Sequence, residues 1–155
     1  MPLSIILLAM IPATILPPIP RKILKTSNFI EKNVRERLRN DHKTTLPRFD
    51  VMSALHRSKD GLKMSELSGV LKVSNGNITG IIDRLVQDGH VKRTVIQGDR
   101  RAYLALLTKK GSKQFQEYAS EHETWINEIL SDISVEEANT ITKLLASITD
   151  NGDLK

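Results

Sequence analysis

The chain has 155 residues, enough for one folded domain with a buried core, and it contains no cysteine, which excludes disulfide bridges, thiolate metal sites and cysteine nucleophiles. The net charge of +5 is unevenly spread, because residues 1–111 carry 20 Lys and Arg against 9 Asp and Glu, whereas residues 112–155 carry 3 against 9. The basic part indicates a polyanionic partner, and the lack of cysteine favours the cytoplasm as the compartment.

Residues 1–20 carry no charge and are long enough to span a membrane. Pro12, Pro17, Pro18 and Pro20 argue against a span, because each proline would interrupt a helix. A secretory signal also fits poorly, since no positive residue precedes the apolar run. We therefore expect residues 1–20 to be an apolar, proline-rich arm that packs at a dimer interface, with no membrane partner. Disorder and membrane attachment are the alternatives.

Two amphipathic helices are predicted after the arm. Apolar residues recur every three to four positions over residues 21–41, which is the period of a helix with one buried face. A second helix is predicted to start near Pro47, a residue suited to the first turn, and to end at Asp60-Gly61. The inward residues of this helix are predicted to be Phe49, Val51, Met52 and Leu55.

Two short helices follow, over residues 65–71 and 74–87, and only Lys72 and Val73 separate them. This is helix-turn-helix spacing. After Gly89 the segments VKRTV and AYLALL are rich in β-branched and apolar residues and flank a polar loop at residues 97–101. They predict a β-hairpin.

The last part of the chain is predicted to be helical again. A long helix opens at residues 108–111, and a final helix begins with the capping box from Ser134 to Glu137. The apolar side of the final helix carries Ala138, Ile141, Leu144, Leu145 and Ile148. The fold class is therefore mainly α with a small β-hairpin (α+β), with eight elements in the order α-α-α-α-β-β-α-α.

The helix over residues 74–87 has the format of a DNA-reading helix. Gly76 and Gly80 each cost about 0.5–1 kcal/mol relative to alanine in a helix interior, and they share one face because they are four residues apart. We hypothesise that this bare face lets the helix enter the major groove, with Ser74 as its cap. The alternative is that Gly80 packs tightly against a neighbouring helix. The predicted DNA-binding residues of this helix are Ser74, Asn75, Gly76, Asn77, Thr79, Gly80 and Arg84.

The hairpin tip is a second predicted DNA contact. Arg100 and Arg101 stand beside Asp99, whose carboxylate could orient a guanidinium in the minor groove. A solvated turn is the alternative interpretation of these three residues, but their position directly after a helix-turn-helix favours the DNA contact.

The segment LPRFDVMSAL and the run from Leu62 to Gly111 resemble the MarR family of bacterial regulators, and the resemblance covers about residues 25–150. Its most specific part is Asp99-Arg100-Arg101 followed by LLTKKG, which matches the family's wing signature and the start of its next helix. The resemblance implies a winged helix-turn-helix at residues 46–111 and dimerisation helices at residues 21–45 and 112–150, all forming one folded unit.

That resemblance further implies a homodimer that binds a pseudo-palindromic, double-stranded DNA operator and usually represses transcription. In many relatives a small, often aromatic, acid releases the DNA. The chain departs from the family pattern at Lys63, where a capping Ser or Thr is common, and in the apolar arm.

An effector pocket is expected where the first two helices meet the long helix, and a buried basic group there would favour an anionic ligand. Its candidate residues are Phe29, Arg48, Phe49, Met52 and His56, for which core packing is the alternative. No metal site or cofactor is expected, because the four histidines are scattered and no phosphate-binding loop is present.

The chain is therefore expected to be a regulator rather than an enzyme. A winged helix that binds proteins and not DNA is the alternative function, against which the wing arginines argue.

Overall fold

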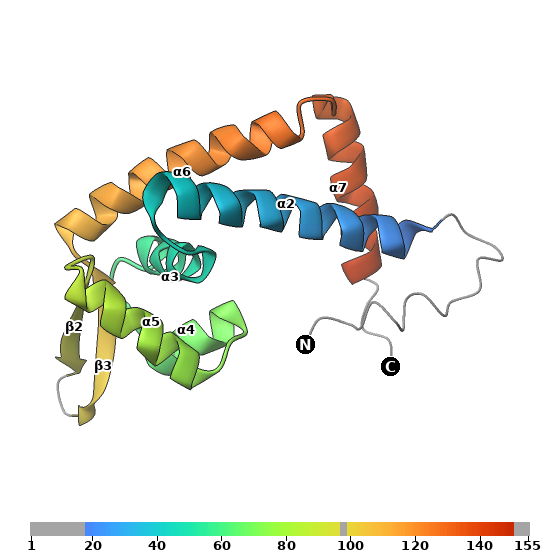
Figure 1. Cartoon of the computed structure of the whole chain (residues 1–155). Helices are drawn as coiled ribbons and strands as arrows, with labels where there is room; N and C mark the ends of the chain where they lie inside the picture. The colour runs from blue at the N-terminus through green and yellow to red at the C-terminus, as the bar shows by residue number, and fades with distance from the viewer. Residues whose placement is uncertain (1–17, 97–98, 151–155) are drawn as a thin grey trace. The chain divides into compact units, whose positions relative to one another are not determined.

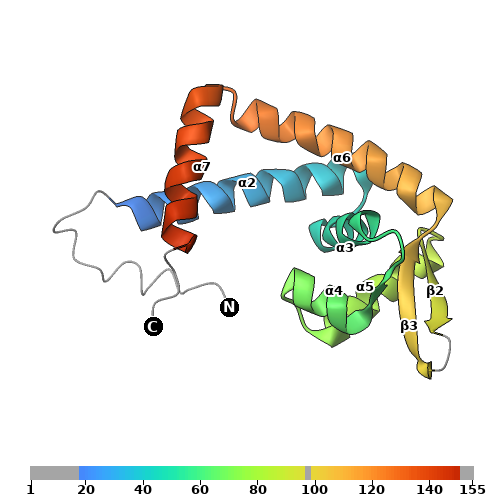
Figure 2. The same ribbon diagram turned by 180° about the vertical axis from the view of Figure 1, so that it is seen from behind.

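The computed structural model describes residues 18–96 and 99–150, and the chain divides into two compact units, Met1–His122 and Glu123–Lys155 (Figures 1 and 2). Its elements are α2 (Ile19–His42), α3 (Leu46–Arg57), β1 (Leu62–Lys63), α4 (Met64–Leu71), α5 (Asn75–Gln87), β2 (Val91–Ile96), β3 (Asp99–Leu107), α6 (Lys109–Ile129) and α7 (Val135–Asp150). The predicted fold class, mainly helical with a small antiparallel sheet, is confirmed.

The start of α2 corrects the predicted boundary of the arm. Residues 1–17 lie outside the described residues, but α2 begins at Ile19 and holds Pro20 in its first turn. Proline is tolerated there because the first N–H groups of a helix have no partner within it. The helix therefore starts two residues before the predicted position at Arg21.

The boundaries of α3 were half correct. Pro47 lies in its first turn, as predicted, but the helix ends at Arg57 rather than at Asp60-Gly61. The intervening residues form a turn in which the Gly61 N–H donates to the Ser58 carbonyl at 2.9 Å. Gly61 has a φ of +86°, a conformation that glycine adopts without strain.

The sheet has the strand order β1-β3-β2, and both pairings are antiparallel. β1 was not predicted; it pairs Leu62 with Ala105 in β3. The hairpin has a regular register from Val91–Leu107 to Val95–Tyr103 and an irregularity between Val95 and Ile96. Because β3 begins at Asp99, residues 99–101 belong to a strand and not to the predicted loop.

The core of the first unit forms where α3, α4 and α5 pack against one another and the sheet (Figure 1). The largest fully buried side chains of the unit are Leu38, Val51, Met52, Leu67, Ile78, Ile82 and Leu85. Burial of one side chain of this size contributes about 1.5–3 kcal/mol to the stability of the fold.

The capping box of α7 is confirmed. The Ser134 N–H donates to the Glu137 carboxylate at 2.8 Å, and the Glu137 N–H donates to Ser134 Oγ at 3.2 Å. These bonds hold the pKa of Glu137 below its usual range, because they favour the charged carboxylate. No helix within residues 18–96 and 99–150 combines the length and apolar character needed to cross a membrane.

Candidate nucleic-acid interface

Ser74 caps α5 as predicted, since its Oγ accepts a hydrogen bond from the Asn77 N–H at 3.4 Å. The hydroxyl of Thr79 donates to the Asn75 carbonyl at 2.9 Å and is therefore engaged within the helix itself. Ile78, Ile82 and Leu85 are fully buried. The predicted DNA-binding residues of α5 are all exposed, which leaves them together on the outer surface of the helix: Ser74, Asn75, Gly76, Asn77, Thr79, Gly80 and Arg84.

The two glycines of α5 face open space. A Cβ atom built at Gly76 or Gly80 would meet nothing within 4 Å. This excludes the alternative in which Gly80 packs tightly against a neighbouring helix. The bare stripe, defined as the face of α5 that carries Gly76 and Gly80, is thus available to a partner.

Strands β2 and β3 lie beside α5 (Figure 1). Asp99, Arg100 and Arg101 form the start of β3, and Asp99 pairs with Ile96 across the hairpin. The side chains of these three residues lie outside the described structure, so their predicted role stays a prediction.

An ion pair that sequence reasoning missed joins α5 to the hairpin. Arg93 Nη2 in β2 donates to Asp83 Oδ1 in α5 at 2.5 Å. Strand alternation could have indicated that Arg93 faces the core, because Val91 and Arg93 must point to the same face of β2 and Val91 is buried.

Arg48, a predicted effector residue, forms an ion pair with Asp88 at the end of α5. The hydrogen bond from the guanidinium lowers the pKa of the Asp88 carboxyl. The Asp88 carbonyl accepts a further hydrogen bond from Lys110 Nζ at 2.8 Å. The end of α5 is thus tied both to α3 and to the start of α6.

The other predicted effector residues are only partly brought together. Phe49 and Met52 are buried in the core. The Phe49 ring lies 5.5 Å from that of Phe115, and the His56 ring lies 4.8 Å from the same ring. Phe29 is 57% exposed on α2 and joins no ring contact of the described residues.

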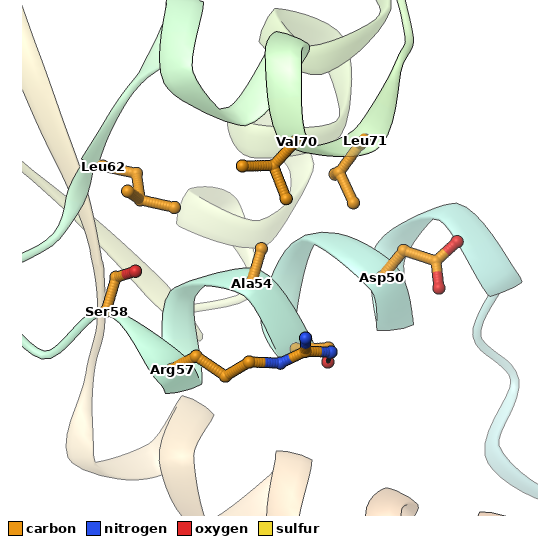
Figure 3. A pocket seen from close by; sticks show the side chains of 8 residues that line it. Asp50, Ala54, Arg57, Ser58, Leu62, Val70 and Leu71 are labelled. Carbon is orange, nitrogen blue, oxygen red and sulfur yellow. Dashed lines mark hydrogen bonds between the residues drawn. The ribbon is translucent and has the colours of Figure 1, made fainter. Parts of the chain in front are cut away.

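A cavity of about 290 Å³ opens between α3, β1 and α4 (Figure 3). Ala54, Leu62 and Val70 are apolar residues of its lining. Arg57 also lines it and donates to Ser53 Oγ at 2.9 Å. None of the five predicted effector residues lines it. Within the described residues no group of three or more histidine, aspartate or glutamate side chains is placed to bind a metal ion.

Comparison with known proteins agrees with this arrangement. The MarR family profile matches residues 44–103. The chain is similar to the transcriptional activatory protein BadR of Rhodopseudomonas palustris, with 29% identity over 84% of this chain and 75% of that protein.

Two solved structures extend the similarity to most of the chain. A MarR family transcriptional regulator from Silicibacter pomeroyi is 30% identical, with a TM-score of 0.72 over 86% of this chain and 91% of that one. A mutant of Escherichia coli MarR in complex with operator DNA is 25% identical, with a TM-score of 0.71 over 84% of this chain and 93% of that one. Taken with the fold, these similarities establish that the chain belongs to the MarR family of transcriptional regulators.

Proposed function

We propose that this regulator binds duplex DNA by placing α5 in the major groove and the hairpin of β2 and β3 against the adjacent minor groove. The observation that carries the proposal is the bare stripe of α5, where a Cβ atom built at Gly76 or Gly80 would meet nothing within 4 Å. A stripe without side chains lets the helix backbone come close to the base edges, and Asn75, Asn77 and Arg84 supply hydrogen-bond donors beside it. The E. coli relative solved with operator DNA supports the same role.

The DNA-binding form is proposed to be a homodimer. Two recognition helices must lie about 34–36 Å apart to read successive turns of the major groove, so one copy alone reads only half of an operator. The apolar face of α7 supports this proposal, because Ile141, Leu144, Leu145 and Ile148 are all exposed. Contiguous exposed apolar surface of this kind is typical of an interface.

Ligand-responsive repression in the cytoplasm completes the proposal. A small aromatic or anionic effector would act by binding more tightly to a form with a different spacing of the recognition helices, since only differential affinity shifts a population. Phe29, Arg48, Phe49, Met52 and His56 remain the proposed effector residues. Because Phe49 and Met52 are buried, we expect ligand entry there to require a local opening of the core.

The test begins with selection of bound fragments from the source genome, followed by titration of a selected duplex at several salt concentrations. With six or more phosphate contacts, affinity should fall by a factor of about 10³ or more between about 50 and 200 mM salt. A protein that ignores duplexes, or binds them without salt dependence, would instead fit the alternative of a protein-interaction module.

Substitution of the bare stripe locates the interface. Gly80→Leu should abolish operator binding, because the new side chain would hold the helix away from the bases. Gly69→Leu in α4 is the matched control, since a Cβ at Gly69 also meets nothing within 4 Å. Both variants should melt at or above the wild-type temperature, because leucine favours a helix over glycine by nearly 1 kcal/mol. Equal DNA affinity for the two variants would contradict the proposal.

A further inference from the structure

One carboxylate of α5 lies next to the bare stripe, that of Asp83. With about 100° per residue, Gly76, Gly80 and Asp83 fall within about 60° of one another around the helix. Asp83 is 54% exposed in its side chain and therefore lies on the surface that the proposed function turns toward DNA. A free carboxylate there would face the phosphates of the groove.

Such a carboxylate opposes DNA binding, because like charges that are brought together at an interface cost several kcal/mol. The repulsion grows as the groove excludes water and the local dielectric falls. A protein that reads DNA with this face needs a means of neutralising Asp83.

Arg93 provides the neutralising charge from the neighbouring element. It lies opposite Ala105 in the register of the hairpin, on the face of β2 that also carries the buried Val91. α5 packs against β2, and from this position Arg93 Nη2 reaches Asp83 Oδ1 at 2.5 Å. The Arg93 side chain is 33% exposed, so the pair is partly shielded from solvent.

We propose that Arg93 is a positioning residue for DNA binding, which neutralises Asp83 and ties α5 to the hairpin so that the bare stripe can approach the duplex. The inference rests on the proposed function, in which α5 faces the DNA. It assigns Arg93 to the carboxylate of its own chain and not to a DNA phosphate. The effect of removing Arg93 must therefore depend on whether Asp83 is present.

A double-mutant cycle in the full-length protein tests this dependence. The four proteins are the wild type, Arg93→Gln, Asp83→Asn and the double variant, titrated with the strongest duplex from the genomic selection. Arg93→Gln alone should weaken binding at least about tenfold, because it exposes the carboxylate to the phosphates. The double variant should return to within about threefold of Asp83→Asn, since no carboxylate is left to repel the DNA.

The salt dependence separates positioning from direct contact. If Arg93 bound a phosphate, its removal would reduce the slope of log affinity against log salt by about 0.9 for each contact, and Asp83→Asn would not restore binding. The proposed role predicts that the slope of the double variant equals that of the wild type.

Two further variants control for charge and for folding. Arg35→Gln removes an equal charge from another arginine that is paired with a carboxylate, Glu31 on α2, and should leave affinity within about twofold. Arg93→Lys retains the positive charge and should keep most of the affinity, even if Arg93→Gln proves unstable in thermal melts.

The outcomes distinguish the inference from the function on which it rests. A wild type that binds no duplex would refute the proposed function itself. A wild type that binds, together with an Arg93→Gln variant of unchanged affinity or a double variant as weak as Arg93→Gln, would overturn the role of Arg93 alone.

Discussion

Gly111 stands where no side chain fits. A Cβ atom at this position would lie 1.9 Å from the carbonyl oxygen of His90. That carbonyl accepts a hydrogen bond from the Thr108 N–H at 2.9 Å, and the Thr108 hydroxyl donates to the Gly89 carbonyl at 2.7 Å. The glycine therefore lets the start of α6 lie directly against the link between α5 and β2.

Gly111→Ala is expected to destabilise the fold by about 3 kcal/mol, because the obstructing atom belongs to the backbone and cannot turn aside. Urea unfolding followed by circular dichroism measures the change. The loss of stability should also weaken DNA binding at temperatures where the wild type is folded and the Gly111→Ala variant is partly unfolded.

Gly69→Ala is the matched comparison, as it makes an identical chemical change in a helix where the new methyl group meets nothing within 4 Å. It should raise stability by up to about 1 kcal/mol, the difference in helix propensity. If the two variants unfolded at the same urea concentration, steric contact with His90 could not be the reason for Gly111.

At the scale of single elements, repeating patterns were sufficient to predict most of the fold. The starts of α5 and α7 were predicted to within one residue, since apolar positions at helical spacing and a capping residue agree on each start. β1 was missed because two residues are too few to show an alternation. The predicted end of α3 was too late, because Asp60-Gly61 was interpreted as the end of the helix. These two residues belong to the turn that follows Arg57.

Contacts between elements were much harder to predict than the elements. The bare stripe of α5 was visible in the sequence, because two glycines in a helix carry a local cost that calls for an explanation. The pair of Arg48 with Asp88 was not, since 40 residues separate them and no local pattern links α3 to the end of α5. The sequence therefore suggested Arg48 as a ligand contact but gave no sign of its carboxylate partner in the same chain.

Two histidines that pack between elements make stability depend on pH. Burial lowers the pKa of His90 and of His122 below the ordinary value of 6.5. In the unfolded chain both rings regain that ordinary value, so the unfolded state takes up protons first as the pH falls. Their contribution is complete above the unfolded pKa and is lost as the pH falls from about 7 toward the lower folded values.

Unfolding free energies measured from pH 7.5 down to 5 should therefore decrease, by less than about 1.4 kcal/mol per pH unit for each ring, because both are partly exposed. His122→Phe should flatten this decrease, since it removes one titrating ring while keeping an aromatic side chain against Phe49, whose ring lies 5.1 Å from that of His122. An unchanged pH profile in this variant would exclude His122 as a source of the dependence.

For the molecule as a whole, basic charge and exposed apolar surface are concentrated in different parts of the chain. The basic residues are concentrated before residue 112, in the part that carries α5 and the hairpin, and the acidic excess follows it. The acidic end has little attraction for DNA, yet α7 has no buried residue and exposes Leu144 and Ile148 to 62% and 60%. An apolar helix face with this composition is suited to a second copy of the chain.

Leu144→Glu should consequently dissociate the proposed homodimer. Because a two-fold interface would contain the new carboxylate twice without a partner, its dissociation constant should rise at least about a hundredfold. Light scattering on a sizing column measures the mass, and operator titration should show weaker binding, since one recognition helix reads only half of the site.

Asn139→Glu is the control. It adds an equal charge to the opposite side of α7, about 140° away around the helix, and should leave both mass and affinity unchanged. A Leu144→Glu variant that stayed dimeric would move the interface away from α7, whereas a monomeric wild type that still bound a full operator tightly would remove the dimer from the mechanism.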